Sequence, residues 1–323
     1  MELGLAYFAG KDPLKISIAK QMGVEHVVTS VRHVDKRVED VYDYRNLLAM
    51  KKGFEDEGLK VSVIEGIGGL NDAKLGLPGK DAAIERFFVL LKNLDRLNIR
   101  TVCYNWMPII EWFRSSNALK TRGGALVTGF DLRDVENAPE TEYGAFSEET
   151  MWANLEYFLK AAVPVAEQHG IRLALHPDDP PVSPLFGISR ILTSADNLQR
   201  ALDIYPNEYN GLTFCQGCVS TMGEDVVAAI HRFGGQKKIF FVHFRDIHGT
   251  KERFQEAFHD DGITDMVAAM KAYYDVGFDG IARPDHVPTM AGEDKASPSY
   301  GLMGNLFAVG YIRGLMESVE KSR

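Results

Sequence analysis

The chain has 323 residues, of which 45% are hydrophobic and 25% are charged, a balance typical of a globular protein with a large apolar core. Its formal net charge is −9 and it has no cluster of lysines and arginines, which excludes a nucleic acid partner. No run approaches the ~18 consecutive apolar residues of a membrane-spanning helix, so we expect no membrane partner.

The N-terminal segment and the cysteines favour a reducing compartment. Residues 1–7 lack the basic stretch and long apolar run of a signal peptide. The three cysteines, Cys103, Cys215 and Cys218, are too few and too unevenly spaced for a disulfide framework. Cys215 and Cys218 have CxxC spacing, but a zinc ribbon needs a second such pair and the sequence has none. We therefore expect a cytoplasmic protein.

Short apolar runs alternate with longer segments of helical period along the chain. Runs with the length and residue types of buried strands lie at about 2–8, 26–30, 60–65, 100–104, 171–175, 211–214, 238–242 and 279–282. Helical segments follow them at about 13–22, 40–57, 81–97, 149–169, 194–205, 224–233, 264–276 and 302–319. In the third helical segment, Ile84, Phe87, Leu91 and Leu94 repeat at three and four residues and form one apolar face.

One connection is much longer than the others. Residues from about 105 to 146 separate the fourth strand from its helix, whereas such loops usually have ~2–6 residues. The insertion contains aromatic and basic side chains suited to covering an anionic small molecule, namely Trp106, Trp112, Arg114, Lys120, Arg122 and Arg133. We therefore expect a functional lid or a small subdomain. The alternative is an insertion that makes subunit contacts in a homo-oligomer.

Eight strand–helix units in strict alternation predict a parallel sheet, and eight is the number that closes as a (β/α)8, or TIM, barrel. A doubly wound open sheet is the competing architecture. It is disfavoured because no GxGxxG or GxxxxGKS/T loop follows a predicted strand. No internal repeat or low-complexity linker divides the chain. The sequence therefore predicts a single α/β barrel domain over residues 1–323, with a long insertion after strand four.

Metal-binding residue types recur at the ends of four consecutive predicted strands. His176, Cys215, His243 and Asp285 lie just past the C-terminal ends of strands five to eight. That rim is where (β/α)8 enzymes build their active sites. Imidazole, thiolate and carboxylate form a donor set for a divalent transition metal, and a catalytic metal keeps a position open for substrate. A single histidine or cysteine is more often structural, but the joint recurrence favours a metal site.

Five segments resemble the signature motifs of one family. They are His176–Pro181 (HPDDPP), Phe214–Gly217 (FCQG), His243–Arg245 (HFR), Arg283–His286 (RPDH) and Cys103–Pro108 (CYNWMP). They are similar to those of D-mannonate dehydratase, the metal-dependent type with a xylose-isomerase-like barrel, and the similarity covers nearly the whole chain. The resemblance implies removal of water from D-mannonate, a small sugar acid, to give 2-keto-3-deoxy-D-gluconate in hexuronate catabolism.

The resemblance also implies a cofactor and roles for individual residues. The cofactor is a divalent metal, Mn2+ or Fe2+ in the first place, with Co2+ or Zn2+ as alternatives. Its ligands would be the four strand-end residues, and the catalytic pair would be His286 and Tyr300. Imidazole and phenol groups suit this chemistry, since one side chain must take the C2 proton while the other protonates the departing C3 hydroxyl. Which of the two does which stays open.

Four further residues are candidate substrate contacts. Arg245 and Arg283 stand two residues from a proposed ligand, and either guanidinium suits a bidentate fork to a substrate carboxylate. The alternative for both is an ion pair with a nearby acidic residue. Asn105 and Trp106 lie in one of the family motifs, at the start of the insertion, and are expected to face the substrate.

Three positions depart from the family pattern. Residues 6–8 replace a basic and aromatic strand ending, Val287 and Pro288 replace a glycine–histidine pair, and Cys218 replaces a small polar residue. None of these positions is a proposed metal ligand, so the departures concern the identity of the substrate. A dehydratase of another aldonate is one alternative. A metal-dependent sugar isomerase or epimerase would form no keto-deoxy product. A non-catalytic barrel would hold a structural metal, but such sites are normally coordinatively closed.

Overall fold

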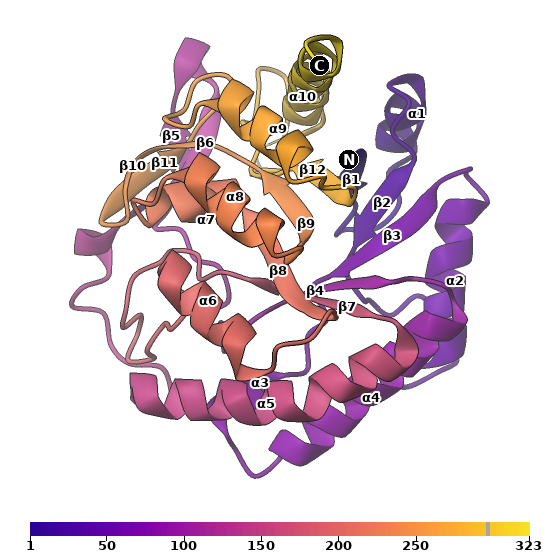
Figure 1. The fold of residues 1–323 in the computed structure, drawn as a ribbon, viewed down its shortest axis with the longest axis vertical. Helices are drawn as coiled ribbons and strands as arrows, with labels where there is room; N and C mark the ends of the chain where they lie inside the picture. Colours follow the sequence, from indigo (N-terminus) through magenta and orange to yellow (C-terminus); the bar gives the residue numbers. More distant parts are fainter. Residues whose placement is uncertain (295–297) are drawn as a thin grey trace.

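The computed structural model describes residues 1–294 and 298–323, and its centre is a closed parallel barrel (Figure 1). The barrel strands are β1 (Glu2–Ala6), β2 (His26–Thr29), β3 (Lys60–Glu65), β4 (Thr101–Asn105), β7 (Arg172–His176), β8 (Asn210–Cys215), β9 (Ile239–Phe244) and β12 (Ile281–Pro284). Around the barrel they follow the order β1-β12-β9-β8-β7-β4-β3-β2. The predicted α/β barrel is confirmed, and each predicted strand forms close to its expected bounds.

Helices cover the outside of the barrel (Figure 1). They are α1 (Pro13–Gln21), α2 (Tyr44–Glu55), α3 (Asn71–Leu75), α4 (Lys80–Arg96), α5 (Glu148–His169), α6 (Ala195–Ile204), α7 (Gln216–Thr221), α8 (Val226–Gly235), α9 (Met266–Asp275) and α10 (Leu302–Lys321). The apolar face predicted for α4 is buried, with Phe87, Leu91 and Leu94 fully inaccessible. The short helices α3 and α7 were not predicted. Within the described residues, no helix has the length and apolar character needed to cross a membrane.

Capping side chains set where the helices around the barrel begin. Ser147 accepts a hydrogen bond from the Thr150 amide at the start of α5, and Ser194 and Asp265 cap α6 and α9 in the same way. Helix α5 ends at Gly170, whose φ of 63° is in the left-handed region that glycine tolerates best. The chain can therefore turn from α5 straight into β7, which delivers His176 to the barrel rim.

A second, antiparallel sheet lies beside the barrel and is called the accessory sheet here (Figure 1). Its strands are β5 (Ser116–Lys120), β6 (Leu126–Asp131), β10 (Ile247–Thr250) and β11 (Arg253–Glu256), in the order β10-β11-β6-β5. Phe130 and Phe254 face each other in register and are buried. The insertion expected at 105–146 thus supplies two strands, and the hairpin of β10 and β11 was not predicted. β5 pairs with β6 and β10 pairs with β11 close along the chain, whereas β6 pairs with β11 from a distant segment, so no local pattern reveals the four-stranded sheet.

Candidate active site

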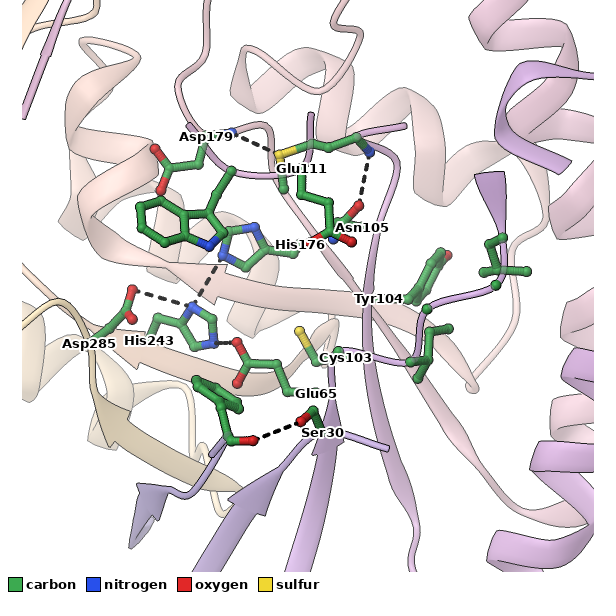
Figure 2. A pocket seen from close by; sticks show the side chains of 18 of the residues that line it. Ser30, Glu65, Cys103, Tyr104, Asn105, Glu111, His176, Asp179, His243 and Asp285 are labelled. Atoms are coloured by element: carbon green, nitrogen blue, oxygen red, sulfur yellow. Dashed lines mark hydrogen bonds and ion pairs between the residues drawn. The ribbon is translucent and has the colours of Figure 1, made fainter. Parts of the chain in front are cut away.

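A cavity of about 370 Å3 opens where the barrel strands end, within the size range of small-molecule sites (Figure 2). It lies at the C-terminal rim, as the barrel reading predicts. The polar and aromatic side chains that line it include Glu65, Lys74, Asn105, Trp112, His176, His243, Arg283, Asp285, His286 and Tyr300. Most of the residues predicted for the site therefore meet in one place.

The four predicted metal ligands converge at this rim, and Figure 2 shows three of them pointing toward one another. His176 Nε2 lies 3.1 Å from His243 Nδ1, which lies 3.6 Å from Asp285 Oδ2. Donor atoms of Cys215, His243 and Asp285 all lie within 4.8 Å of one another, as do those of His176, Cys215 and Cys218. Donors from four consecutive barrel strands therefore gather at one part of the rim, in two groups that share Cys215.

The two imidazoles face each other in a way that suits a cation. His176 Nδ1 lies 2.7 Å from the carbonyl oxygen of Pro177 and must donate to it, which leaves Nε2 as a lone-pair donor. His243 Nε2 lies 3.2 Å from Glu65 Oε1, a charge contact that favours a proton on Nε2. This leaves Nδ1 as the nitrogen that can give its lone pair to a metal. Two lone pairs at this distance repel unless a cation or proton lies between them. Adjacent ligands of an ion with ~2.1 Å bonds are about 3.0–3.4 Å apart, so the separation of the two imidazole nitrogens fits a divalent metal.

Neighbouring charges and hydrogen bonds keep the sulfur and carboxylate donors anionic although both are buried. Burial opposes ionisation of Cys215, but its hydrogen bond with Cys218 and the charge of Arg245 hold the pKa of its thiol well below the usual value. Burial would likewise raise the pKa of Asp285, but Arg283 and the nearby imidazoles hold it well below its usual range. Metal ligands of these types must be deprotonated, so the site is prepared to bind a cation.

Glu65, at the end of β3, is a site residue that sequence reasoning missed. Its carboxylate accepts hydrogen bonds from Arg283 Nε at 2.9 Å and Nη2 at 2.7 Å, while Arg283 Nη1 donates to Asp285 Oδ1 at 2.7 Å. Burial would raise the pKa of Glu65, but Arg283 and His243 lower it to about 2. The guanidinium of Arg283 therefore links two carboxylates in the cavity wall. Glu65 also ends a predicted strand, and the rule that found the four donors would have found it.

His286 and Tyr300, the predicted catalytic pair, line the same cavity beside Asp285. Their ring centroids lie 5.9 Å apart, and His286 Nε2 and Tyr300 Oη lie 3.7 and 3.5 Å from Asp285 Oδ1. Burial and the charge of Asp285 raise the pKa of Tyr300 well above its usual value, so the phenol keeps its proton. Both side chains therefore stand next to a proposed metal ligand, where a bound sugar acid would lie.

Arg245 lies outside the cavity lining, which corrects its expected contact with a substrate. It is 1% exposed, and its Nε and Nη2 each donate to a carboxylate oxygen of Glu256 at 2.7 Å. Its Nη1 donates to Asp179 Oδ2 at 2.9 Å and lies 3.5 Å from Cys215 Sγ. The ion-pair alternative therefore describes Arg245, with Asp179 and Glu256 as its partners in place of an acidic residue beside it in the sequence. Its charge supports the Cys215 thiolate.

Asn105 and Trp106 point in different directions although they are adjacent. Asn105 lines the cavity, and its Oδ1 accepts a hydrogen bond from Lys74 Nζ at 2.8 Å. Trp106 is 1% exposed, its ring lies 5.2 Å from that of Phe158, and its indole N–H donates to the carbonyl of Met151. The expected substrate contact of Trp106 is corrected, because this side chain belongs to the core.

Lys74 and Trp112 complete the cavity wall. Lys74, from the unpredicted helix α3, is 6% exposed, and burial lowers the pKa of its ammonium to about 8. Most of it is still protonated at neutral pH. Trp112, from the insertion, is 40% exposed and its ring lies 5.2 Å from that of His286. The composition of the insertion had pointed to Trp112, but no sequence signal singled out Lys74.

The fold and the donor set define a (β/α)8 barrel enzyme with a site suited to a divalent metal. The sequence matches the family model described as D-mannonate dehydratase (UxuA) over residues 1–143 and 140–323. The chain belongs to the D-mannonate dehydratase family, and it is therefore an enzyme of the hydro-lyase class.

Individual relatives agree with this assignment. Mannonate dehydratase 2 of Halalkalibacterium halodurans is 37% identical over 347 residues, which cover 99% of each chain. The crystal structure of mannonate dehydratase from Streptococcus suis serotype 2 superposes with a TM-score of 0.90 at 33% identity, covering 100% of this chain and 94% of that one. A xylose isomerase domain protein from Planctomyces limnophilus has a TM-score of 0.63 at 13% identity over 99% and 98% of the chains, which shows the shared fold alone.

Proposed function

We propose that this enzyme removes water from D-mannonate to give 2-keto-3-deoxy-D-gluconate, with a divalent metal held by His176, Cys215, His243 and Asp285. The convergence of these donors beside the predicted catalytic pair is the observation that supports the proposal most strongly. We expect Mn2+ or Fe2+ in the cell, although Co2+ and Zn2+ also suit the donors, and availability would decide. The three free cysteines fit action in the cytoplasm.

The proposed reaction breaks the C2–H and C3–O bonds of the sugar acid. The bound metal would stabilise the negative charge that develops next to the carboxylate. His286 and Tyr300 would divide the proton transfers, one taking the C2 proton and the other protonating the C3 hydroxyl as it leaves as water. The enol that remains tautomerises to the 2-keto acid. Arg283 would keep Asp285 ionised and oriented throughout, because it is anchored to Glu65 on its other side.

Lys74 is our proposed contact for the oxygen atoms of the sugar acid. It lines the cavity and forms no ion pair with a carboxylate in the described part of the chain. Its Nζ donates to Asn105 Oδ1 and, at 3.4 Å, to the carbonyl of Met107, so one N–H remains for a ligand. An ammonium at that position suits hydroxyl or carboxylate oxygens. This role extends the expected contact of Asn105 with the substrate.

A second candidate substrate is another aldonate, and the position of Phe8 favours testing it. Phe8 is one of the departures from the family pattern, and it lines the cavity. Its ring packs edge-on against Tyr300, with centroids 5.3 Å apart. A change at this position therefore alters the surface that a substrate meets. Val287, another departure from the family pattern, is buried and does not line the cavity.

A product assay tests the proposal. The protein would be stripped with a chelator, reloaded separately with Mn2+, Fe2+, Co2+ or Zn2+, and given D-mannonate and a panel of other aldonates. We expect metal-dependent formation of a 2-keto-3-deoxy acid from D-mannonate. Turnover of a different aldonate alone would replace the substrate. A sugar product formed without loss of water would favour an isomerase or epimerase, and no conversion with any metal would reject the dehydratase proposal.

A further inference from the structure

The accessory sheet reaches the predicted active site through the carboxylate of Glu256. Glu256 is the last residue of β11, is fully buried, and does not line the cavity. Its Oε1 lies 2.9 Å from His286 Nδ1, on the side of the ring away from Asp285. A residue of an unpredicted hairpin therefore touches one of the two side chains proposed to move protons.

Two arginines hold Glu256 in its ionised form. Arg245 donates to both carboxylate oxygens at 2.7 Å, and Arg114 Nη2 donates to Oε1 at 2.8 Å. Both guanidinium groups are also bound to Asp179, so the cluster is a closed network of two cations and two anions. Burial would raise the pKa of Glu256, but Arg245, His286 and Arg114 lower it. A carboxylate in this state can only accept hydrogen bonds.

The direction of the contact with His286 follows from this inventory. Because Glu256 can only accept, His286 Nδ1 must carry the proton that joins them. Arg114 Nη2 lies 3.2 Å from the same nitrogen, but its two protons go to shorter contacts of 2.8 Å with Glu256 Oε1 and Asp179 Oδ2. The other ring nitrogen, Nε2, lies on the side of Asp285 and Tyr300, 3.7 Å from Asp285 Oδ1.

The backbone of His286 shows that its position is imposed by its surroundings. Its φ is 46°, in the left-handed region that a side chain other than glycine seldom adopts. The ring contacts those of Trp112 and Tyr300, whose centroids lie 5.2 and 5.9 Å away. Strain of this kind persists only where neighbouring groups hold the residue, and Glu256 supplies the hydrogen bond that does so.

We propose that Glu256 is a positioning residue for His286: its carboxylate accepts the Nδ1 proton and holds the ring so that Nε2 faces the cavity. The inference rests on the proposed function for the role of His286, but the proton position itself does not depend on turnover. The inference also gives the insertion and the hairpin a structural role at the active site. Arg114 comes from the insertion and Glu256 from the hairpin, and together they form the frame behind the imidazole.

The first test is the position of the proton on His286. In 15N–1H correlation spectra of the Zn2+-loaded enzyme, the ring is assigned among the nine histidines by its absence in His286→Gln. We expect a proton on Nδ1 in the wild-type protein, held in a hydrogen bond, and partial loss of its signal in Glu256→Gln, whose amide can donate to Nδ1 as well as accept from it. An Nδ1 without a proton in the wild-type protein, or an Nδ1–H signal that is unchanged in Glu256→Gln, would overturn the inference.

The second test measures turnover. In Glu256→Gln we expect kcat on D-mannonate to fall about 10- to 100-fold, with KM and metal content unchanged and with partial recovery in Glu256→Asp. If His286 takes the C2 proton, a larger isotope effect with C2-deuterated substrate accompanies the fall. The matched control is Asp131→Asn at the end of β6 in the same sheet, which pairs with Arg133 and should keep full kcat.

The two tests separate the failure of the inference from that of the proposed function. Unchanged kcat in Glu256→Gln, or a fall that only follows loss of metal or a lower melting temperature, would overturn the positioning role. If the wild-type enzyme dehydrates no aldonate, the proposed function fails instead. The proton position on His286 would then still decide whether Glu256 fixes the ring.

Discussion

The two walls of the cavity carry different chemical groups. One wall, at the ends of β7, β8, β9 and β12, carries the four metal-type donors, whose charges are balanced within the wall. The opposite wall, formed after β3 and by α3, presents the backbone of Gly66, Gly68 and Gly69 and the ammonium of Lys74. These glycines all have positive φ, so a side chain at any of them would be strained. The first wall carries groups suited to metal binding and catalysis. The second wall shapes the space in which a ligand would lie.

The contrast is clearest in the two cations that line the cavity. Arg283 forms ion pairs with Glu65 and Asp285 at 2.7 Å each, so its charge is already neutralised by these two carboxylates. Lys74 is bound to an amide oxygen and a carbonyl, which are neutral partners. A ligand can therefore bind the ammonium of Lys74 without breaking an ion pair. Changes on the donor wall should act on metal binding and turnover, and changes on the glycine wall should act on KM.

The largest effect is expected for Cys215→Ser on the donor wall. A serine hydroxyl stays protonated at neutral pH, so the site loses an anionic donor. We expect metal affinity to fall about 100-fold or more, with turnover lost in parallel, as measured by metal content after dialysis. Cys218→Ser is the matched control and should keep its metal. Loss of metal in the control alone would mean that the sulfur donor is the other cysteine of the CxxC pair.

A nearly equal loss is expected for His286→Asn, but by a different route. The asparagine removes the proposed proton-transfer group without removing a metal donor. Turnover should fall about 100- to 10,000-fold while metal content stays the same. His248→Asn, on β10 of the accessory sheet, is the control and should behave like the wild-type enzyme. Normal turnover in His286→Asn would exclude this residue from the chemistry.

A moderate effect is expected for Lys74→Met on the glycine wall. Methionine keeps the length of the side chain but loses the charged donor, and such a hydrogen bond contributes roughly 1.5–3 kcal/mol. KM for D-mannonate should therefore rise by about 10- to 100-fold, with kcat and metal content little changed. Lys92→Met, on the exposed face of α4, is the matched control. A fall in kcat at constant KM would show that the two walls do not divide their roles in this way.

The smallest effect on activity is expected for Trp106→Phe. The substitution removes the indole hydrogen bond to Met151 and leaves a small gap against Phe158. We expect the free energy of unfolding to fall by about 1–3 kcal/mol, while KM and kcat stay unchanged. Denaturant unfolding and a standard assay would measure both. A raised KM would return Trp106 to the substrate contacts from which its buried position removes it.

The sequence by itself determined the barrel and the position of the four proposed donors at its rim, because both follow from local patterns. A barrel strand buried on both faces reads as a short apolar run, and a polar metal-type residue directly after such a run must lie at the rim. This is why His176 and Cys215 could be placed without any knowledge of long-range contacts. The same rule applied to the third strand would have included Glu65.

Only the tertiary structure decided which partner each buried charge has and which way the side chains of the insertion point. Arg283 binds a carboxylate 218 residues away, and Arg245 binds Glu256 from a hairpin whose strands pair outside the barrel. Asn105 and Trp106 differ by one position, and one faces the cavity while the other enters the core. The physical reason is that ion pairs and packing depend on which chain segments meet in space, and a one-residue step along an extended chain reverses the direction of a side chain.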